Sequence, residues 1–195
     1  MQFTFITGNA NKAKYVAEWL GAHVPHHSLD LDEIQTLDLH ALVTHKAKQA
    51  YGVLKTPVLV EDAQLSCPAL GGLPGPFIKW FIDAMGVDGL AKLMQTCSDR
   101  SAHGKICYAL YNGHDMHFFE GEMHGIIAPE PRGNGGFGFD AIFINDGFTT
   151  TRAEMTEAEY AQTSYRKQAL DKLKEFLHAP QRNIRPAVSK NGENH

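Results

Sequence analysis

Two neighbouring carboxylates, Glu61 and Asp62, are the first residues whose position in the sequence suggests chemistry. They directly follow residues 57–60, an apolar run that predicts a strand buried on both faces and ending at the two acids. Open α/β sheets bind ligands at the carboxyl ends of their strands, and carboxylates there can hold Mg²⁺. The alternative is an ordinary acidic strand end. Glu33, in an acidic loop, is by itself compatible with a solvated role.

The amino-terminal segment has the features of an anion site. Residues 2–7 predict a buried strand, Gly8-Asn9 interrupts it, and apolar residues three and four apart predict a helix over residues 10–20 that ends at Gly21. The first turn of such a helix offers free backbone N–H groups, and Lys12 would add a positive charge. A plain strand-helix turn with a solvated lysine is the alternative. The sequence contains no Gly-x-x-x-x-Gly-Lys-Ser/Thr loop.

Aromatic and basic side chains elsewhere could contact a nucleotide. Lys79 stands among apolar and aromatic residues after a turn-rich loop, so it either points at a ligand or extends to solvent. Phe137 and Phe139 lie in a glycine-rich segment, where each ring could stack on a base or pack in the core. Arg166 falls in the first turn of a helix that Ser164 would cap. The helix dipole disfavours positive charge there, so we expect a ligand or a carboxylate beside it.

The histidines and cysteines give weaker indications of a functional site than the residues above. The chain has 11 histidines, and a transition-metal site at residues 23–27 or 114–117 is conceivable, although scattered surface histidines explain the pattern better. The three cysteines are an odd number without Cys-x-x-Cys spacing, which argues against a disulfide framework or a zinc ribbon. No motif for a serine or cysteine nucleophile is present in the sequence.

The composition of the chain indicates the class of protein that carries these side chains. The 195 residues are 43% hydrophobic and 21% charged, with a formal net charge of −4, as in an ordinary globular protein of one domain. A slightly acidic chain does not bind nucleic acid through bulk charge. The sequence has no apolar run of membrane-spanning length and no signal peptide, so we expect a cytoplasmic protein that binds no membrane.

The remaining pattern predicts alternating strands and helices. We expect a helix capped by Asp38, a hairpin turn at Asn112-Gly113 and a helix opened by the capping box Thr156-x-x-Glu159. The other expected elements are a weak strand at 23–29, helices at 77–84 and 87–95, strands at 105–111, 115–120, 122–128 and 139–144, and a disordered tail over 179–195 after a single domain at 1–178.

Taken in order, these segments resemble the inosine triphosphate pyrophosphatase family. The matching motifs span about residues 3–177. They are Thr7-Gly8-Asn9-x-x-Lys12, Asp30-Leu31-x-Glu33-Ile34-Gln35, Val60-Glu61-Asp62, Ala69-Leu70-Gly71-Gly72-Leu73-Pro74-Gly75-Pro76-Phe77-Ile78-Lys79-Trp80-Phe81, Gly136-Phe137-Gly138-Phe139-Asp140, Ala153-Glu154-Met155 and Ser164-x-Arg166-x-x-Ala169-Leu170. The resemblance implies a two-lobed α/β fold with a long mixed sheet flanked by helices, a cleft between the lobes and a homodimer.

The resemblance also implies an activity and a set of roles. The activity is Mg²⁺-dependent hydrolysis of ITP, dITP and XTP to the monophosphate and pyrophosphate. Glu33 and Asp62 become the Mg²⁺ ligands, and Asp62 is also the general base. The residues implied in substrate binding are Thr7, Gly8, Asn9, Ala10, Asn11, Lys12, Lys46, Ala63, Lys79, Phe137, Gly138, Phe139, Asp140, Tyr160, Tyr165 and Arg166.

Two positions depart from the family pattern. Tyr165 stands where the family usually has a histidine, and Tyr160 stands where it usually has a lysine. Both positions border the base pocket in the family. Two alternatives therefore stay open: the same hydrolysis with another base preference, and a nucleotide-binding regulator without catalysis.

Overall fold

The computed structural model describes residues 2–179, which form a mixed α/β fold around one seven-stranded sheet. The expected disordered tail lies outside the described residues except for Ala179. The sheet order is β2-β1-β3-β5-β6-β7, and β4 pairs with β3. The first three of these strands are parallel and the others are antiparallel. Their bounds are β1 Thr4–Ile6, β2 His26–His27, β3 Val58–Ser66, β4 Pro74–Gly75, β5 Ser101–Tyr111, β6 Met116–Ile127 and β7 Phe143–Asn145.

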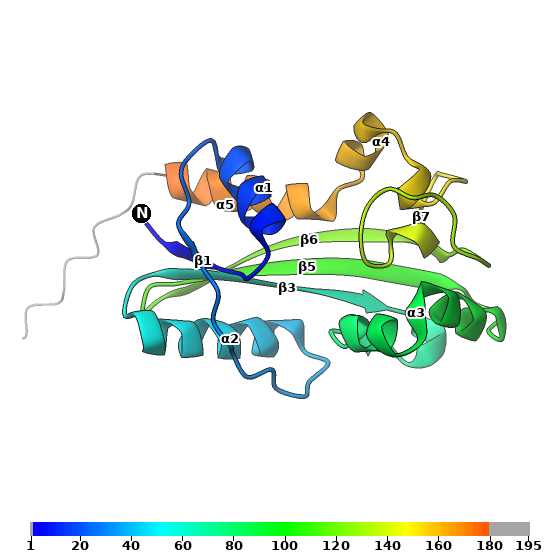
Figure 1. The fold of residues 1–195 in the computed structure, drawn as a ribbon, viewed down its shortest axis with the longest axis horizontal. Helices are drawn as coiled ribbons and strands as arrows, with labels where there is room; N and C mark the ends of the chain where they lie inside the picture. The colour runs from blue at the N-terminus through cyan, green and yellow to red at the C-terminus, as the bar shows by residue number, and fades with distance from the viewer. Residues whose placement is uncertain (1, 180–195) are drawn as a thin grey trace, which may run out of the picture.

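Helices cover both faces of the sheet. They are α1 Ala10–Leu20, α2 Leu39–Leu54, α3 Ile78–Gln95, α4 Glu157–Gln162 and α5 Tyr165–His178. Helices α1 and α5 lie on one face and α2 on the other, while α3, α4 and β7 gather around the far end of the long strands β3, β5 and β6 (Figure 1). The sheet therefore carries two lobes, as expected. No helix within residues 2–179 has the length and apolarity needed to cross a membrane.

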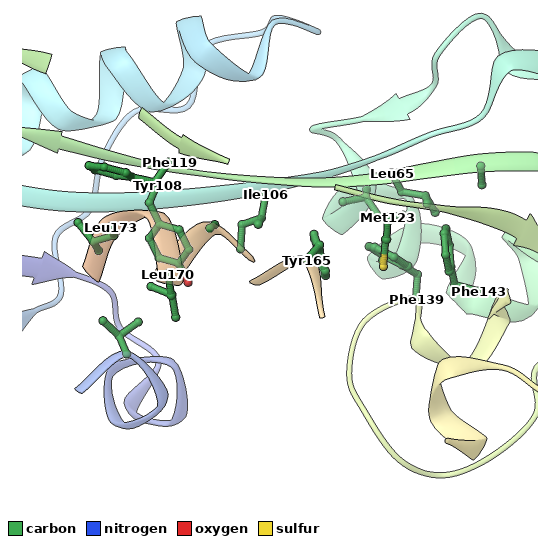
Figure 2. Close-up of a cluster of buried hydrophobic side chains, with 14 of the residues drawn as sticks. Leu65, Ile106, Tyr108, Phe119, Met123, Phe139, Phe143, Tyr165, Leu170 and Leu173 are labelled. Carbon is green, nitrogen blue, oxygen red and sulfur yellow. The ribbon is translucent and has the colours of Figure 1, made fainter. Parts of the chain in front are cut away.

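The core divides along the two faces. Phe5, Leu59 and Tyr108 pack with α1 and α5 on one face, and Val60 and Cys107 pack with α2 on the other. Figure 2 shows the first cluster continuing along the sheet to Phe139 and Phe143. Alternate residues of β3 and β5 thus face opposite layers, which is the period of two expected of a strand.

Local capping explains where the helices begin. The Asp38 side chain accepts hydrogen bonds from His40 N and Ala41 N at 2.9 and 3.1 Å, and Ser164 Oγ accepts one from Lys167 N at 3.2 Å. These caps and the box at Thr156 confirm the predicted starts of α2, α5 and α4. The helix predicted over 10–20 has those bounds, with Gly21 in the left-handed region at φ 67°.

Several strand predictions were wrong in length. Strand β3 continues through the two acids to Ser66, because its pairing with β5 extends to Ser66 and His103. The strands predicted at 115–120 and 122–128 are one strand, β6, because it stays paired with β5 along its length. Residues 140–142 form a 3₁₀ turn, so β7 begins only at Phe143. The expected weak strand at 23–29 is reduced to His26–His27.

Candidate functional site

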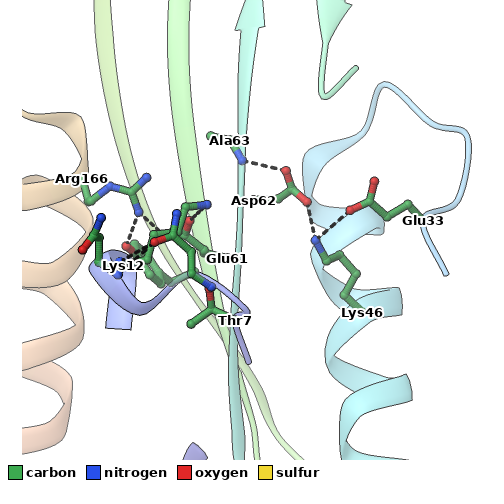
Figure 3. Close-up of polar contacts among 11 residues, drawn as sticks. Thr7, Lys12, Glu33, Lys46, Glu61, Asp62, Ala63 and Arg166 are labelled. Carbon is green, nitrogen blue, oxygen red and sulfur yellow. Dashed lines mark hydrogen bonds and ion pairs between the residues drawn. The ribbon is translucent and has the colours of Figure 1, made fainter. Parts of the chain in front are cut away.

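Glu61 and Asp62 leave opposite faces of the sheet, because they are consecutive residues in the middle of β3. Glu61 points toward α1 and α5, and Asp62 points toward α2 (Figure 3). The expectation that these two neighbours could jointly hold one cation is therefore wrong. Both side chains nevertheless line one cavity. It lies at the edge of β3 beyond Leu59, which has no parallel partner because β1 ends at Ile6.

Asp62 belongs to a cluster with Lys46 of α2 and Glu33 of the preceding loop. Lys46 Nζ lies 2.7 Å from Asp62 Oδ2 and 3.3 Å from Glu33 Oε1, and Ala63 N donates to Asp62 Oδ1 at 2.9 Å. Burial raises the pKa of the Asp62 carboxyl, and the charge of Lys46 offsets only part of that rise. Burial acts to lower the pKa of Lys46, but Asp62 and then Glu33 prevail and raise it. The cluster thus holds an ammonium beside a carboxylate of increased basicity.

Glu61 belongs to a second cluster on the other face. Lys12 Nζ lies 2.7 Å from Glu61 Oε1, Arg166 pairs with Oε2, and Arg166 Nη1 donates to the Tyr108 hydroxyl at 2.8 Å. Burial acts to raise the pKa of Glu61, but the charges of Arg166 and then Lys12 lower it from the ordinary 4.5 to about 2. The buried Glu61 carboxylate therefore stays ionised and holds Lys12 and Arg166 together. It is the carboxylate expected beside Arg166.

Close packing of α5 on β6 fixes the position of Arg166. A Cβ atom added at Gly121 of β6 would overlap the carbonyl oxygen of Tyr165. Only glycine permits this approach, so residue 121 brings the first turn of α5 against the sheet. Arg166 is consequently delivered to Glu61 from a helix that has no room to shift toward the strand.

The loop before α1 is more self-contained than expected. Asn9 Oδ1 accepts hydrogen bonds from Asn11 N and Lys12 N at 3.0 and 3.2 Å. Thr7 Oγ1 accepts one from Asn9 N at 3.1 Å. Two of the helix N–H groups that we expected to be free are thus capped by Asn9, and an anion must compete with that side chain for them.

A single cavity of about 660 Å³ joins both clusters. Most of the predicted substrate-binding and metal residues line it: Thr7, Gly8, Asn9, Lys12, Glu33, Lys46, Asp62, Ala63, Lys79, Phe137, Gly138, Phe139, Asp140, Tyr165 and Arg166. Ala10, Asn11 and Tyr160 do not line it. The exposed Lys79 lies at the start of α3 with its ammonium 6.0 Å from the Trp80 ring centroid. The cavity is therefore surrounded by four cationic side chains from four helices.

The segment 137–140 separates its two rings. Phe137 is 58% exposed, and its ring lies 5.7 Å from the Arg166 guanidinium carbon, whereas Phe139 is buried against Phe143. Phe139 therefore takes the core alternative, and stacking on a base stays a prediction for Phe137. Phe137 is left as an aromatic face at the cavity, while Phe139 anchors the segment in the core.

Asp140 is held by three donors. Its carboxylate accepts hydrogen bonds from Phe137 N at 3.0 Å, Arg152 Nε at 2.9 Å and the Tyr160 hydroxyl at 2.9 Å. The Arg152 guanidinium carbon lies 4.2 Å from the centroid of the Tyr160 ring. Asp140 therefore ties the Phe137 segment to α4. Tyr160 reaches the site through Asp140 instead of lining the cavity.

Reasoning from the sequence missed three contributors. The sequence suggests Glu61 only as a cation ligand beside Asp62, and its ion pairs are missed because its partners Lys12 and Arg166 lie far away in the chain. Tyr108 lies in an apolar strand without any local signal, and Arg152 is 1% exposed although arginine is usually a surface residue. Their roles follow only from tertiary contacts.

The Glu33 and Asp62 carboxylates fit a hard divalent cation. Both lie within 3.3 Å of the same ammonium, so they already converge on one point that a positive charge occupies. Oxygen donors of this kind suit Mg²⁺. Among residues 2–179, neither of the two conceivable histidine sites, at 23–27 and 114–117, brings three metal-ligating groups together.

The chain has relatives of known family. The profile of the Ham1 family matches residues 3–176. The chain is 45% identical over 177 residues to the inosine triphosphate pyrophosphatase of Batrachochytrium dendrobatidis, covering 89% of this chain and 92% of that protein. It is 41% identical over 182 residues to the inosine triphosphate pyrophosphatase of Yarrowia lipolytica, covering 91% and 96%.

Solved structures share the fold. A HAM1 protein from Coxiella burnetii superposes with a TM-score of 0.81 at 27% identity, covering 91% of this chain and 98% of that chain. A nucleoside-triphosphatase, or dITP/XTP pyrophosphatase, from Mycobacterium abscessus superposes with a TM-score of 0.74 at 26% identity, covering 89% and 98%.

Proposed function

This chain belongs to the Ham1 family, and from that premise we propose that it hydrolyses non-standard purine nucleoside triphosphates such as ITP, dITP and XTP. The products are the nucleoside monophosphate and pyrophosphate. The observation that carries the proposal is the cavity where Lys12, Lys46, Lys79 and Arg166 surround a carboxylate of raised pKa. Such a cavity suits a substrate with several negative charges and a reaction that needs a base.

The triphosphate occupies the part of the cavity between α1, α2 and α3. Lys12, Lys46 and Lys79 neutralise its oxygens, and the loop over residues 7–11 contributes backbone and side-chain donors. Lys12 and Lys46 are each held by a carboxylate in the absence of substrate. Of these two groups, the Lys12 ammonium reaches the phosphates already positioned, which reduces the entropy lost on binding.

Asp62 is the general base in this proposal. It accepts a proton from a water molecule whose oxygen bonds to the α-phosphorus. The bond from that phosphorus to the bridging oxygen of the β-phosphate then breaks, and pyrophosphate leaves with the electron pair. Ala63 N holds the carboxylate in place by donating a hydrogen bond to Asp62 Oδ1. The raised pKa makes Asp62 a stronger base than an ordinary aspartate.

Mg²⁺ is the cation that we propose for Glu33 and Asp62. When bound, it would neutralise charge on the phosphate oxygens and on the leaving pyrophosphate. Binding of the cation requires Lys46 to release one or both carboxylates and turn toward the phosphates.

The base lies over Phe137 in this proposal. Its exposed ring offers a stacking surface, and Gly138 beside it lines the same cavity. Inosine and xanthine carry an acceptor at position 6 where adenine carries an amino donor. A donor such as Arg166 therefore favours inosine and xanthine and leaves adenine mispaired. Asp140 positions this segment through its bond to Phe137 N.

The test is hydrolysis of ITP by the full chain with Mg²⁺, following IMP and pyrophosphate. Equimolar release of both supports the proposal, and release of orthophosphate alone contradicts it. A panel of purine triphosphates ranked by kcat/KM tests the alternative of another base preference, which Tyr160 and Tyr165 favour. Tight binding of ITP without turnover would indicate the non-catalytic regulator instead.

Three expectations about the protein as a whole accompany this function. We propose that it acts as a homodimer, that residues 1–178 form its single domain, and that it works in the cytoplasm, where nucleotide pools are maintained. Size-exclusion chromatography with light scattering tests the first of these. A mass of one chain at micromolar concentration contradicts it.

A further inference from the structure

A second group of ligating side chains lies on the α2 face of the sheet. His40 Nε2, Cys107 Sγ and a carboxylate oxygen of Glu120 all lie within 4.8 Å of one another. His40 Nε2 and Glu120 Oε1 are 2.6 Å apart. None of these three residues lines the cavity of about 660 Å³ in which we place the nucleotide. These residues therefore form a group outside that cavity, although Cys107 is the residue of β5 that pairs with Asp62 of β3.

Three elements hold these side chains. Cys107 of β5 and Glu120 of β6 are directly paired residues, so their side chains leave the same face of the sheet as neighbours. His40 lies in the first turn of α2, and its ring stacks on Phe118 of β6 with centroids 4.3 Å apart. The stacking orients the imidazole, so the three donors converge without contributions from a loop.

The group has a buried floor and an accessible rim. Cys107 is fully buried, whereas the His40 and Glu120 side chains keep 44% and 27% of their surface exposed. A cation can therefore arrive from solvent between the imidazole and the carboxylate and meet the sulfur below them. This arrangement differs from that of a structural cysteine, whose sulfur meets only apolar neighbours.

The donor set selects a chemical class of ligand. One imidazole nitrogen, one sulfur and one carboxylate oxygen are the usual ligands of Zn²⁺, and three protein ligands leave its fourth position to water. Mg²⁺ and Ca²⁺ prefer oxygen alone. We propose that His40, Cys107 and Glu120 form a binding site for a thiophilic divalent cation of the Zn²⁺ type.

Binding requires three local changes. The hydrogen bond between His40 Nε2 and Glu120 Oε1 breaks, and the neutral imidazole carries its proton on Nδ1, so that Nε2 offers its lone pair to the cation. Lys105 Nζ now lies 2.7 Å from Glu120 Oε1 and 3.2 Å from Glu122 Oε1, so the arriving cation displaces it from Glu120 while Glu122 retains it. Burial and, after it, the charge of Glu120 raise the pKa of the Cys107 thiol to about 12. The S–H bond breaks as the sulfur–metal bond forms, and one proton per cation leaves to the buffer.

Cobalt(II) chloride is the probe for this site. The full chain is titrated anaerobically in excess Mg²⁺, which occupies sites made of oxygen alone. We expect a sulfur-to-cobalt charge-transfer absorption that saturates at one equivalent and is abolished by Zn²⁺. Cys107→Ser should remove the absorption, and His40→Gln should weaken cobalt binding by about tenfold or more. Cys67→Ser and Cys97→Ser are the matched controls and should leave both the absorption and the affinity for cobalt unchanged.

The outcomes separate the alternatives. No absorption in the unmodified chain at millimolar cobalt, absorption that persists in Cys107→Ser, or absorption lost equally in Cys97→Ser overturns the proposal. Circular dichroism confirms that each variant is folded. If Cys107→Ser does not fold, His40→Gln decides the question, because its exposed position leaves the core intact. None of these readouts depends on hydrolysis of a nucleotide.

Discussion

Replacing Glu61 with glutamine should destabilise the protein strongly although the change adds and removes almost no volume. The side chain is 4% exposed and pairs with both Lys12 and Arg166. Glutamine removes the negative charge and leaves the buried Arg166 and the partly exposed Lys12 without compensation. Breaking a buried pair in this way typically costs about 3–5 kcal/mol.

The pKa of Glu61 gives an independent magnitude. A fall from 4.5 to about 2 on folding corresponds to about 3 kcal/mol of stabilisation near neutral pH. Because the pKa is lowered in the folded state, this stabilisation is present above pH 4.5 and is lost as the pH falls toward 2. Less than half of it remains at pH 3. For a protein of this size the loss lowers the melting temperature by about 6–12 °C.

Urea denaturation of the two proteins at a series of pH values measures this contribution. The difference in unfolding free energy should be about 3 kcal/mol at pH 7 and should shrink between pH 5 and pH 3. Glu18→Gln is the matched control, since Glu18 is 65% exposed and its Lys14 partner lies 3.7 Å away. A difference below about 1 kcal/mol, or one constant from pH 6 to pH 3, would refute the reasoning.

Three further substitutions test the site. Asp62→Asn should reduce kcat by about 10²–10⁴ without lowering stability, because it removes the base but keeps the shape of the side chain. In the unmodified enzyme, activity should fall with acid at a pH above the ordinary aspartate pKa, since burial raises the pKa of Asp62. Phe137→Ala should raise KM for ITP by an amount worth about 1–3 kcal/mol of stacking, with kcat and melting temperature nearly unchanged because the ring is 58% exposed. Gly121→Ala should force α5 away from β6 and raise KM through displacement of Arg166. Steady-state kinetics with ITP and thermal unfolding check all three.

Each of these has a result that contradicts it. Near-normal kcat in Asp62→Asn would remove Asp62 from the role of base, and an acid limb at the ordinary aspartate value would argue against a raised pKa. A Phe137→Leu variant matches the alanine variant in lacking the ring but retains apolar bulk, so full affinity in both would exclude stacking. Normal KM and normal stability in Gly121→Ala would show that α5 tolerates the extra methyl group.

The sequence predicted those features of the fold that depend on contacts between residues close together in the chain. The starts of α2 and α5 follow from Asp38 and Ser164, whose side chains bond to N–H groups two or three residues ahead. The end of α1 follows from Gly21, which adopts a conformation that favours glycine. In each case the residue and its partner lie within one helical turn, so a short stretch of sequence contains both sides of the interaction.

Strand lengths could not be predicted in the same way. The residues after Asp62 lose the continuous apolar character of a buried strand, so β3 seemed to stop there. Pairing with β5 continues to Ser66, because β5 supplies backbone partners along its whole length. The extent of β3 is thus set by a strand about forty residues away in the chain, which has no local signature.

The length of β3 also explains why its two acids, Glu61 and Asp62, have different roles. Had the strand ended before Glu61 and Asp62, both carboxylates could have turned toward one cation. Because the strand continues, Glu61 must face α1 and α5, where it fixes Lys12 and Arg166, and Asp62 must face α2, where Lys46 holds it. One nucleotide at the open edge of β3 can then contact both groups of cations, while only Asp62 has the raised pKa that a base requires.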